Sequence, residues 1–185
     1  MLNKEIRQHA VFRSLLRAMS RPGQAWPLPQ AVDSEPRHHL LTVVEAMCDY
    51  ESSFHLAGKD QLLAAVVSHG CGAPTVPVEK AAFLLAPEGS SHGLLGRLHR
   101  GTPDFPDRGA TVVYQVKSFA GKGPSPLLSG PGIRETVRPT LAGLDPSELP
   151  ALAVINRDFP LGVDVLFVSH DGQVMGLPRS TRIGM

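Results

Sequence analysis

The residues best suited to chemistry lie near the end of the chain, on both sides of a predicted β-hairpin. Asp164 precedes one apolar strand, and a second strand is followed by Arg179, Ser180 and Thr181. A guanidinium and two hydroxyls at a strand end suit the oxygens of a phosphate or phosphonate group, because charge-assisted hydrogen bonds to such oxygens are strong. The same residues fit a structural turn or a subunit contact. The sequence therefore supports a small-anion site and leaves these two alternatives open.

The hairpin itself is predicted by Asp171-Gly172, because glycine supplies the positive φ that a tight turn needs. The continuous apolar run Val165–Val168 before the turn is typical of a strand buried on both faces. Asp164 and Arg179 lie at equal separations from the turn in the sequence, so strand pairing brings them to the same end of the sheet. We expect Asp164 either to pin the hairpin through a salt bridge or to orient Arg179 toward a ligand or subunit.

A second pair of arginines, Arg13 and Arg17, stands one helical turn apart in the first predicted helix. They lie off the apolar stripe of that helix, so a solvated surface is the ordinary interpretation. The alternative is contact with an anion or a partner, since the guanidinium fork matches carboxylate and phosphate groups. Both arginines therefore count among the ligand- or partner-binding candidates.

The common catalytic, nucleotide-binding and metal-binding signatures are missing from the sequence. Gly121-Lys122-Gly123 lacks the earlier glycine and the following Ser or Thr of a phosphate-binding loop. Ser129 lacks the preceding glycine of a Gly-x-Ser-x-Gly nucleophile elbow. No His-Glu-x-x-His motif occurs. The chain is therefore expected to have no catalytic residues of its own and no bound metal.

Composition and charge limit the class of protein. At 185 residues the chain is long enough for one well-packed domain and short for two. A net charge of +1 favours neither nucleic acid nor a membrane surface as a partner, and no apolar run approaches the length of a spanning helix. Cys48 and Cys71 have neither the number nor the spacing of a disulfide framework, which indicates a reducing compartment. We expect a cytoplasmic protein.

Hydrophobic periodicity and turn residues predict helices that alternate with strands. The predicted helices span 4–20, 38–48, 60–70, 90–98 and 145–157. The predicted strands span 53–57, 80–86, 111–116, 127–128, 165–168 and 174–177, with an extended piece at 24–28. This alternation argues for an α/β layered domain with a mixed sheet, whose antiparallel part is the C-terminal hairpin. The glycine- and proline-rich stretch 117–135 is predicted to be a long ordered excursion.

The spacing of apolar residues predicts which face of each helix packs against the core. The expected inward residues are Phe12, Leu15, Leu16 and Met19 in the first helix, Leu40, Val43, Val44 and Met47 in the second, and Leu62, Leu63, Val66 and Val67 in the third. The last helix is expected to begin at Asp145 as N-cap, with Glu148 reaching back to close a capping box.

Several short motifs together resemble one known family. They are Phe12–Gly23, Gly72–Pro74, Gly101–Pro103, Gly109–Thr111, Leu128–Ile133, Phe159–Asp164 and Leu177–Thr181. Their content and order are similar to the H subunit (PhnH) of the bacterial carbon–phosphorus lyase system, and they cover nearly the whole chain. The chain departs from the family pattern at Gly70, where a histidine is expected, since His69 stands one residue earlier.

The resemblance implies a single three-layer α/β/α domain over residues 1–185, with a mixed sheet similar to that in the large domain of pyridoxal-phosphate-dependent aminotransferases. It also implies that no cofactor is bound. The sequence agrees, because a Schiff-base enzyme needs a desolvated lysine. Each lysine of this chain is predicted at a helix end, at a strand start or in a glycine-rich loop. These lysines are Lys4, Lys59, Lys80, Lys117 and Lys122.

The resemblance further implies a non-catalytic but essential subunit of the carbon–phosphorus lyase complex in phosphonate catabolism. The family is needed for transfer of the ribose triphosphate moiety of ATP to an alkylphosphonate, and the implied partners are the G, I and J subunits. A homodimer is implied too, with the excursion 117–135 as a candidate contact. The alternative, from a different class, is a stand-alone enzyme or small-anion-binding protein that uses Arg179, Ser180 and Thr181 together with Arg13.

Overall fold

The computed structural model describes residues 4–29 and 36–184. The helices in this part of the chain are α1 (Lys4–Ser20), α2 (Pro36–Met47), α3 (Gln61–Cys71) and α4 (Glu148–Ile155). The strands are β1 (Ala25–Pro27), β2 (Phe54–Leu56), β3 (Phe83–Ala86), β4 (Thr111–Val116), β5 (Leu127–Ser129), β6 (Asp164–Ser169), β7 (Gln173–Leu177) and β8 (Arg182–Gly184). Short 3-10 turns lie at Val78–Lys80, Leu95–Arg97, Pro106–Arg108 and Asn156–Asp158.

Six of these strands form one mixed sheet in the order β1-β7-β6-β4-β3-β2, and β5 and β8 form a separate two-stranded ribbon. β2, β3, β4 and β6 are parallel, whereas β7 pairs antiparallel with both β6 and β1. β6 and β7 make the hairpin predicted around Asp171-Gly172, with Val165 opposite Leu177. The predicted mixed sheet with an antiparallel C-terminal hairpin is confirmed.

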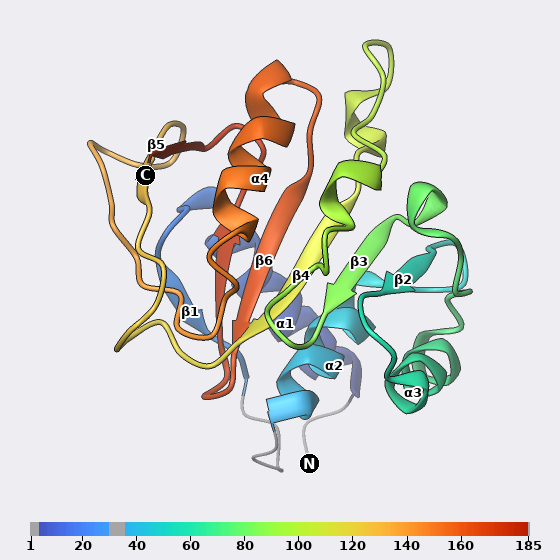
Figure 1. The fold of residues 1–185 in the computed structure, drawn as a ribbon. Helices are drawn as coiled ribbons and strands as arrows, with labels where there is room; N and C mark the ends of the chain where they lie inside the picture. Colours follow the sequence, from blue (N-terminus) through green and yellow to red (C-terminus); the bar gives the residue numbers. More distant parts are fainter. Residues whose placement is uncertain (1–3, 30–35, 185) are drawn as a thin grey trace.

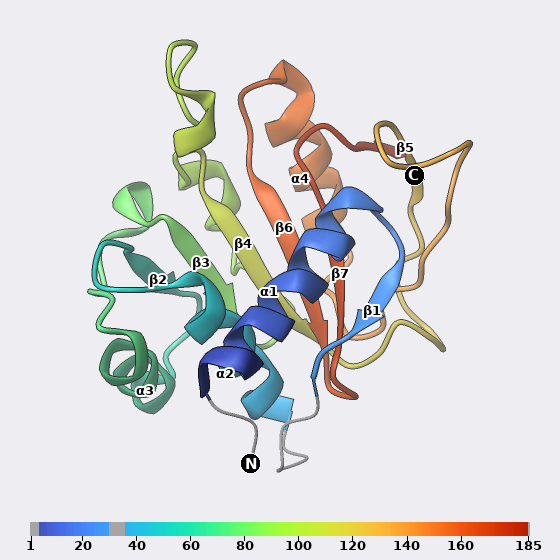
Figure 2. The same cartoon turned by 180° about the vertical axis from the view of Figure 1, so that it is seen from behind.

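Helices cover both faces of the mixed sheet. On one face, α1 and α2 place Leu15 and Leu40 in an apolar cluster with Leu166. On the other face, Leu152 of α4 packs in a cluster with Phe167. Figure 1 shows α4 in front of the sheet, and Figure 2 shows α1 and α2 over the opposite face. The predicted three-layer α/β/α arrangement is confirmed, and the likeness to the aminotransferase domain stays a prediction.

The two central strands, β4 and β6, are buried on both faces. Residues 112–116 of β4 and 165–169 of β6 are all buried. Tyr114 and Phe167 stack across the two strands with their ring centroids 5.6 Å apart. Burial of one large apolar side chain stabilises a fold by about 1.5–3 kcal/mol. Coverage of both faces explains why these strands are mainly apolar in the sequence, with Gln115 as a buried polar residue within β4.

The inward face of α1 is displaced from the predicted one, although Leu15 is buried and Met19 is partly buried, as predicted. Val11, Leu15 and Ala18 point into the core, with exposures of 1%, 3% and 0%. Phe12 and Leu16 are 47% and 55% exposed, so placing them on the inward face was wrong. Successive helical residues lie about 100° apart around the axis. Packing through positions 11, 15 and 18 therefore turns the adjacent positions toward solvent.

The inward face of α3, at the edge of the sheet beside β2 (Figure 1), is narrower than predicted. Leu63 and Val67 are buried, as predicted, whereas Leu62 and Val66 are 70% and 43% exposed, contrary to prediction. Because the helix packs on the body through a single stripe, only residues four apart face inward. In α2, by contrast, Leu40, Val43 and Val44 are buried, as predicted, and Met47 is half-buried.

Two boundaries near these helices differ from prediction. α3 runs past Gly70 and is capped at Gly72, which has the left-handed φ of 76° that stops a helix. β3 begins at Phe83 rather than at residue 80, because Val78–Lys80 forms a 3-10 turn.

The helix predicted over 90–98 is reduced to one 3-10 turn at Leu95–Arg97. His92 and Gly93 have φ values of 51° and 78°, which a right-handed helix does not allow. This stretch is therefore a loop, and its Leu95 and Leu98 are buried in the apolar core.

The stretch 117–135 is an ordered excursion beside the C terminus (Figure 1). Its short predicted strand is confirmed as β5, which pairs antiparallel with β8. Isolated bridges join Leu128 to Val137 and Ser118 to Ala142. Within residues 4–29 and 36–184, no helix has the length and apolar character needed to cross a bilayer.

Candidate functional site

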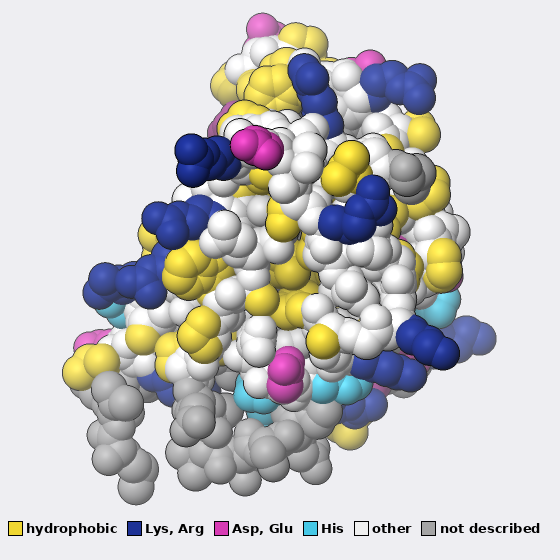
Figure 3. All heavy atoms as spheres, turned by 90° about the vertical axis from the view of Figure 1, so that its left-hand side faces the viewer, with side chains coloured by type: hydrophobic (Ala, Val, Ile, Leu, Met, Phe, Trp, Pro, Cys, Tyr) yellow, Lys and Arg dark blue, Asp and Glu magenta, His cyan; other side chains and the backbone are white. Residues whose placement is uncertain are grey.

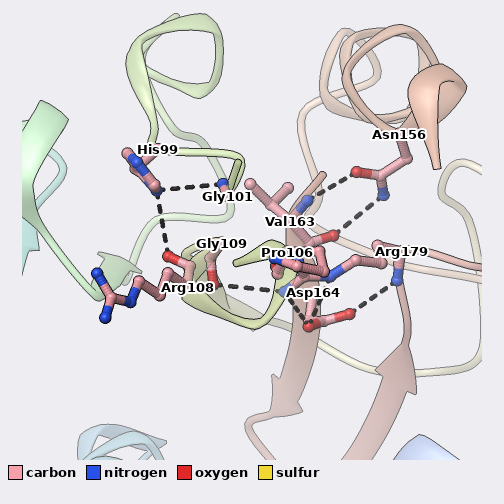
Figure 4. Close-up of polar contacts among 9 residues, drawn as sticks. All are labelled: His99, Gly101, Pro106, Arg108, Gly109, Asn156, Val163, Asp164 and Arg179. Atoms are coloured by element: carbon pink, nitrogen blue, oxygen red, sulfur yellow. Dashed lines mark hydrogen bonds and ion pairs between the residues drawn. The ribbon is translucent and has the colours of Figure 1, made fainter. Parts of the chain in front are cut away.

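The Asp164–Arg179 pair lies where β6 begins and β7 has just ended (Figure 4). Arg179 donates from Nη2 and Nε to Asp164 Oδ2, at 2.6 and 3.1 Å. Its backbone N–H donates to Asp164 Oδ1 at 2.8 Å. The hairpin register brings the two residues to the same end of the sheet, and the predicted salt bridge is confirmed.

The rest of the Arg179 guanidinium is held by the loop that precedes β4. Nη1 donates to the Pro106 carbonyl, and Nη2 lies 3.4 Å from the Gly109 carbonyl oxygen. The Arg179 side chain is only 12% exposed and that of Asp164 is 24% exposed. Every guanidinium nitrogen thus has a partner within the chain, and Asp164 compensates the charge. This geometry favours the pinning role of the pair over a free anion-binding arginine.

Gly109 makes this contact sterically possible. A Cβ at position 109 would lie 2.5 Å from Arg179 Nη1 and 2.4 Å from the Gly162 carbonyl oxygen. Both distances are far inside van der Waals contact, so any larger residue pushes the guanidinium or the loop away. The glycine before β4 is therefore required by close approach to Arg179.

Asn156 fixes the loop that enters β6 in the same region (Figure 4). Its Nδ2 donates to the Val163 carbonyl at 3.0 Å, and its Oδ1 accepts from the Val163 N–H at 2.8 Å. A Cβ on Gly162 would lie 2.4 Å from Asn156 Oδ1, so the contact also depends on this glycine. No motif singled out Asn156. The available signal was an Asn near the end of the helix predicted over 145–157, where its side chain can bond to nearby backbone. The observed helix α4 ends one residue before Asn156.

His99 closes the other end of the loop that holds Arg179. Its Nδ1 lies 3.1 Å from the Gly101 nitrogen and 3.2 Å from the Arg108 carbonyl oxygen. The ring nitrogen accepts from the first or donates to the second according to its tautomer. In either state the imidazole braces the loop between Leu98 and β4.

Ser180 and Thr181 follow Arg179 into a cavity of about 730 Å³. Its lining residues are Gly130, Pro131, Ala153, Asn156, Arg157, Phe159, Arg179, Ser180, Thr181, Arg182 and Ile183. Thr181 is 4% exposed, and its Oγ1 has no hydrogen-bond partner among the described residues. The consecutive residues Arg179, Ser180 and Thr181 thus all line the same cavity.

Arg13 and Arg17 are not part of this cavity. Both are exposed on α1, which packs on the opposite face of the sheet from α4. The guanidinium carbons of Arg17 and Arg21 each lie 5.7 Å from the centre of the Trp26 ring, within cation–π range. Figure 3 shows arginine and lysine side chains spread over the side of the molecule that lies to the left in Figure 1, with few acidic ones among them.

A buried carboxylate, that of Glu148, forms a second polar cluster on the α4 face of the sheet. Glu148 is 3% exposed. Its Oε1 accepts from the Ser91 N–H at 2.8 Å and from the Ser91 hydroxyl at 3.0 Å, and its Oε2 accepts from the Tyr114 hydroxyl. Burial, followed by the charge of Glu148, raises the pKa of Tyr114 above its ordinary value. This cluster ties α4 to β4 and to the loop after β3.

The predicted capping box at α4 is therefore wrong. The helix begins at Glu148 with Ser147 at its N-cap position, rather than with Asp145 as N-cap. In the turn before the helix, Asp145 Oδ1 accepts from the Ser147 N–H at 2.9 Å and from the Ser147 hydroxyl at 2.8 Å. These two hydrogen bonds, the backbone one first, lower the pKa of Asp145. The Glu148 side chain does not reach back, since buried donors on β4 and at residue 91 bind it instead.

The described polar groups stabilise loops, and they do not form an activated nucleophile. The ring Nδ1 of His55 contacts the Val76 carbonyl oxygen, and His99 contacts backbone atoms. Within the described ranges, no hydrogen bond joins a serine or cysteine side chain to a histidine ring that could take its proton. Across the same ranges, no three His, Cys, Asp or Glu side chains gather to hold a metal ion.

The fold and site together define an α/β/α domain in which a half-buried ion pair and a buried carboxylate cluster fix the loops around a mixed sheet. The family model described as bacterial phosphonate metabolism protein (PhnH) matches residues 2–184. The chain therefore belongs to the PhnH family, and the resemblance seen in its motifs is confirmed.

Two relatives agree with this assignment. A protein of Stutzerimonas stutzeri, whose name describes a candidate C-P lyase subunit protein HtxG, is 36% identical over 180 residues, with 97% of this chain and 87% of the relative covered. The alpha-D-ribose 1-methylphosphonate 5-triphosphate synthase subunit PhnH of Rhizobium meliloti (strain 1021) is 27% identical over 180 residues, with 94% and 88% covered.

Proposed function

We propose that this protein is an essential, non-catalytic subunit of a carbon–phosphorus lyase complex in phosphonate catabolism. In this role it is needed for transfer of the ribose triphosphate moiety of ATP to an alkylphosphonate. The observation that carries the proposal is the match of the PhnH family over residues 2–184. One relative is named as a subunit of a synthase whose product is a ribose methylphosphonate triphosphate.

The contacts of the polar residues support a role without catalysis of its own. Arg179 and Asp164 bind each other and the neighbouring loop carbonyls. Glu148 is enclosed by donors from Ser91 and Tyr114. The side chains of Arg179, Asp164 and Glu148 are thus bound within the fold. Such contacts suit a subunit that presents a fixed surface to its partners.

The proposed partners are the G, I and J subunits of the complex and a second copy of this chain. Support for a protein partner comes from α1, where Phe12 and Leu16 stand one turn apart and are 47% and 55% exposed. Exposed apolar side chains that lie together, as these two do, are more typical of a contact surface than ones scattered singly. Light scattering of the isolated chain at micromolar concentration gives twice the mass of one chain if the homodimer forms, and the mass of one chain if it does not.

A cytoplasmic location is part of the proposal. Both cysteines are free, with Cys48 buried and Cys71 half-buried. Burial raises the pKa of the Cys48 thiol to about 12, so this thiol stays protonated and unreactive at neutral pH. Free thiols and the use of ATP both fit the reducing interior of a bacterial cell.

Growth on a phosphonate tests the proposed function. Deleting the gene for this chain in its own host is expected to abolish growth with methylphosphonate as the sole phosphorus source, because the complex lacks an essential subunit. Growth with inorganic phosphate should be unchanged, and a plasmid copy of the gene should restore growth on methylphosphonate. Normal growth of the deletion strain on methylphosphonate would refute the essential role.

A further inference from the structure

The side chains that line the cavity at Thr181 include positive charges and no negative one. Three of its lining side chains are arginines, Arg157, Arg179 and Arg182, and none of its lining residues is Asp or Glu. Asp164 compensates the charge of Arg179 from outside the cavity, because it is bonded to the guanidinium. The positive charge available inside the cavity therefore belongs to Arg157 and Arg182.

Arg157 and Arg182 come from different elements and are both exposed. Arg157 lies in the 3-10 turn after α4, and Arg182 is the first residue of β8. Among the described carboxylates, neither arginine has an ion-pair partner, and the adjacent Asp158 is bound to Arg100 instead, at 3.4 Å. Two free guanidiniums that line one cavity match an anion with several oxygens.

The hydroxyl of Thr181 is an independent sign of a missing partner. Thr181 is 4% exposed, and its Oγ1 has no hydrogen-bond partner in the described chain. A buried polar atom without a partner is destabilising, and native proteins usually satisfy such atoms. Because Thr181 lines the cavity, an oxygen of a ligand bound there is able to satisfy this hydroxyl, and the neighbouring Ser180 adds a second one.

The size and walls of the cavity set the class of ligand. A volume of about 730 Å³ is far larger than a bare phosphate ion needs and lies in the range of small-molecule sites. Pro131, Ala153, Ile183 and the 60% exposed ring of Phe159 supply apolar surface. The end of α4 also turns carbonyl groups toward this region, and their partial negative charge is smaller than the two full charges of the arginines.

We propose that this cavity binds an organic phosphate or phosphonate, with the oxygens on Arg157 and Arg182 and the apolar body against Phe159 and Pro131. Thr181 and Ser180 donate the neutral hydrogen bonds. Arg179 was one candidate for an anion site in the sequence, but here it positions the turn 178–181 through its bonds to Asp164 and does not bind the anion. This inference goes beyond the proposed function, because a subunit role does not require a ligand on this chain.

Calorimetric titration of the purified chain with phenylphosphonate and with phenyl phosphate tests this site. Both probes carry a phosphoryl dianion and an aromatic body, so they separate a phosphonate preference from a phosphate-ester preference. Both should bind more tightly than inorganic phosphate, which lacks the apolar part. Arg157→Ala and Arg182→Ala should each weaken binding about tenfold, since each removes a charged hydrogen-bond donor, and the double variant should show no binding.

Arg134→Ala is the matched control. Arg134 is an exposed arginine of the excursion 117–135, the segment that supplies Gly130 and Pro131 to the cavity, but Arg134 itself does not line the cavity. It should bind both probes like the unsubstituted chain. Unchanged melting temperatures of all variants show that folding is intact. Absence of binding by the unsubstituted chain, or equal binding by the double variant, would overturn the proposal. The growth experiment tests the subunit role, and the titration tests the ligand site. The two can therefore fail independently: a strain that carries the double variant can still grow on methylphosphonate when the purified chain binds neither probe.

Discussion

Replacing Glu148 by alanine is expected to lower the free energy of unfolding by about 3 kcal/mol or more. The carboxylate is 3% exposed and accepts hydrogen bonds from the Ser91 N–H, the Ser91 hydroxyl and the Tyr114 hydroxyl. Each buried donor left without a partner costs about 1–3 kcal/mol, and the missing side chain leaves a void as well. Urea denaturation followed by circular dichroism measures the loss.

Glu88→Ala is the control for this change. The Glu88 side chain is 73% exposed and pairs only loosely with His92, at 3.6 Å. Its removal should change the free energy of unfolding by no more than about 0.5 kcal/mol. If Glu148→Ala costs as little as Glu88→Ala, the carboxylate cluster does not tie α4 to the sheet as described.

Replacing Arg179 by alanine is expected to cost about 3 kcal/mol, well above the roughly 0–1 kcal/mol of an exposed salt bridge. The two side chains of the pair are 12% and 24% exposed, so the variant leaves Asp164 without its cation in a largely dry setting. It also removes the donors to the Pro106 and Gly109 carbonyls. Denaturation of Arg179→Ala, Asp164→Ala and the double variant should give a double-mutant loss smaller than the sum of the single losses.

The exposed pair Arg97–Glu79 supplies the comparison, because its side chains are 59% and 50% exposed. Arg97→Ala should cost less than about 1 kcal/mol. If Arg179→Ala is equally mild and yet abolishes phosphonate growth, the arginine contacts a ligand or partner, and the pinning role is wrong.

The C-terminal hairpin and its salt bridge could be predicted from the sequence, because both depend on local register. Once Asp171-Gly172 fixes the turn, the pairing of β6 with β7 places Asp164 beside Arg179. The contacts of Arg179 with Pro106 and Gly109 could not be predicted. They join residues some seventy positions apart, and only the packing of the loop before β4 on β6 brings them together.

The errors share one physical cause, which is competition between a local pattern and tertiary packing. Glu148 fits a capping box, and buried donors around Tyr114 bind it more strongly. Phe12 and Leu16 fit an amphipathic stripe, and α1 packs through a neighbouring stripe instead. For Arg179, a candidate anion-binding residue, the sequence predicted the position beside Asp164 correctly. Its contacts with the Pro106 and Gly109 carbonyls depend on tertiary packing and were not predicted.

The most direct test of the account is purification of this chain, tagged, from its own host grown on methylphosphonate. Mass spectrometry of the purified material should identify the G, I and J subunits in fixed proportion to the chain, and the chain separated from them should not turn over a phosphonate. A chain bearing Arg134→Ala should recover the same partners. Recovery of the chain alone, with catalytic turnover of a phosphonate, would contradict the account.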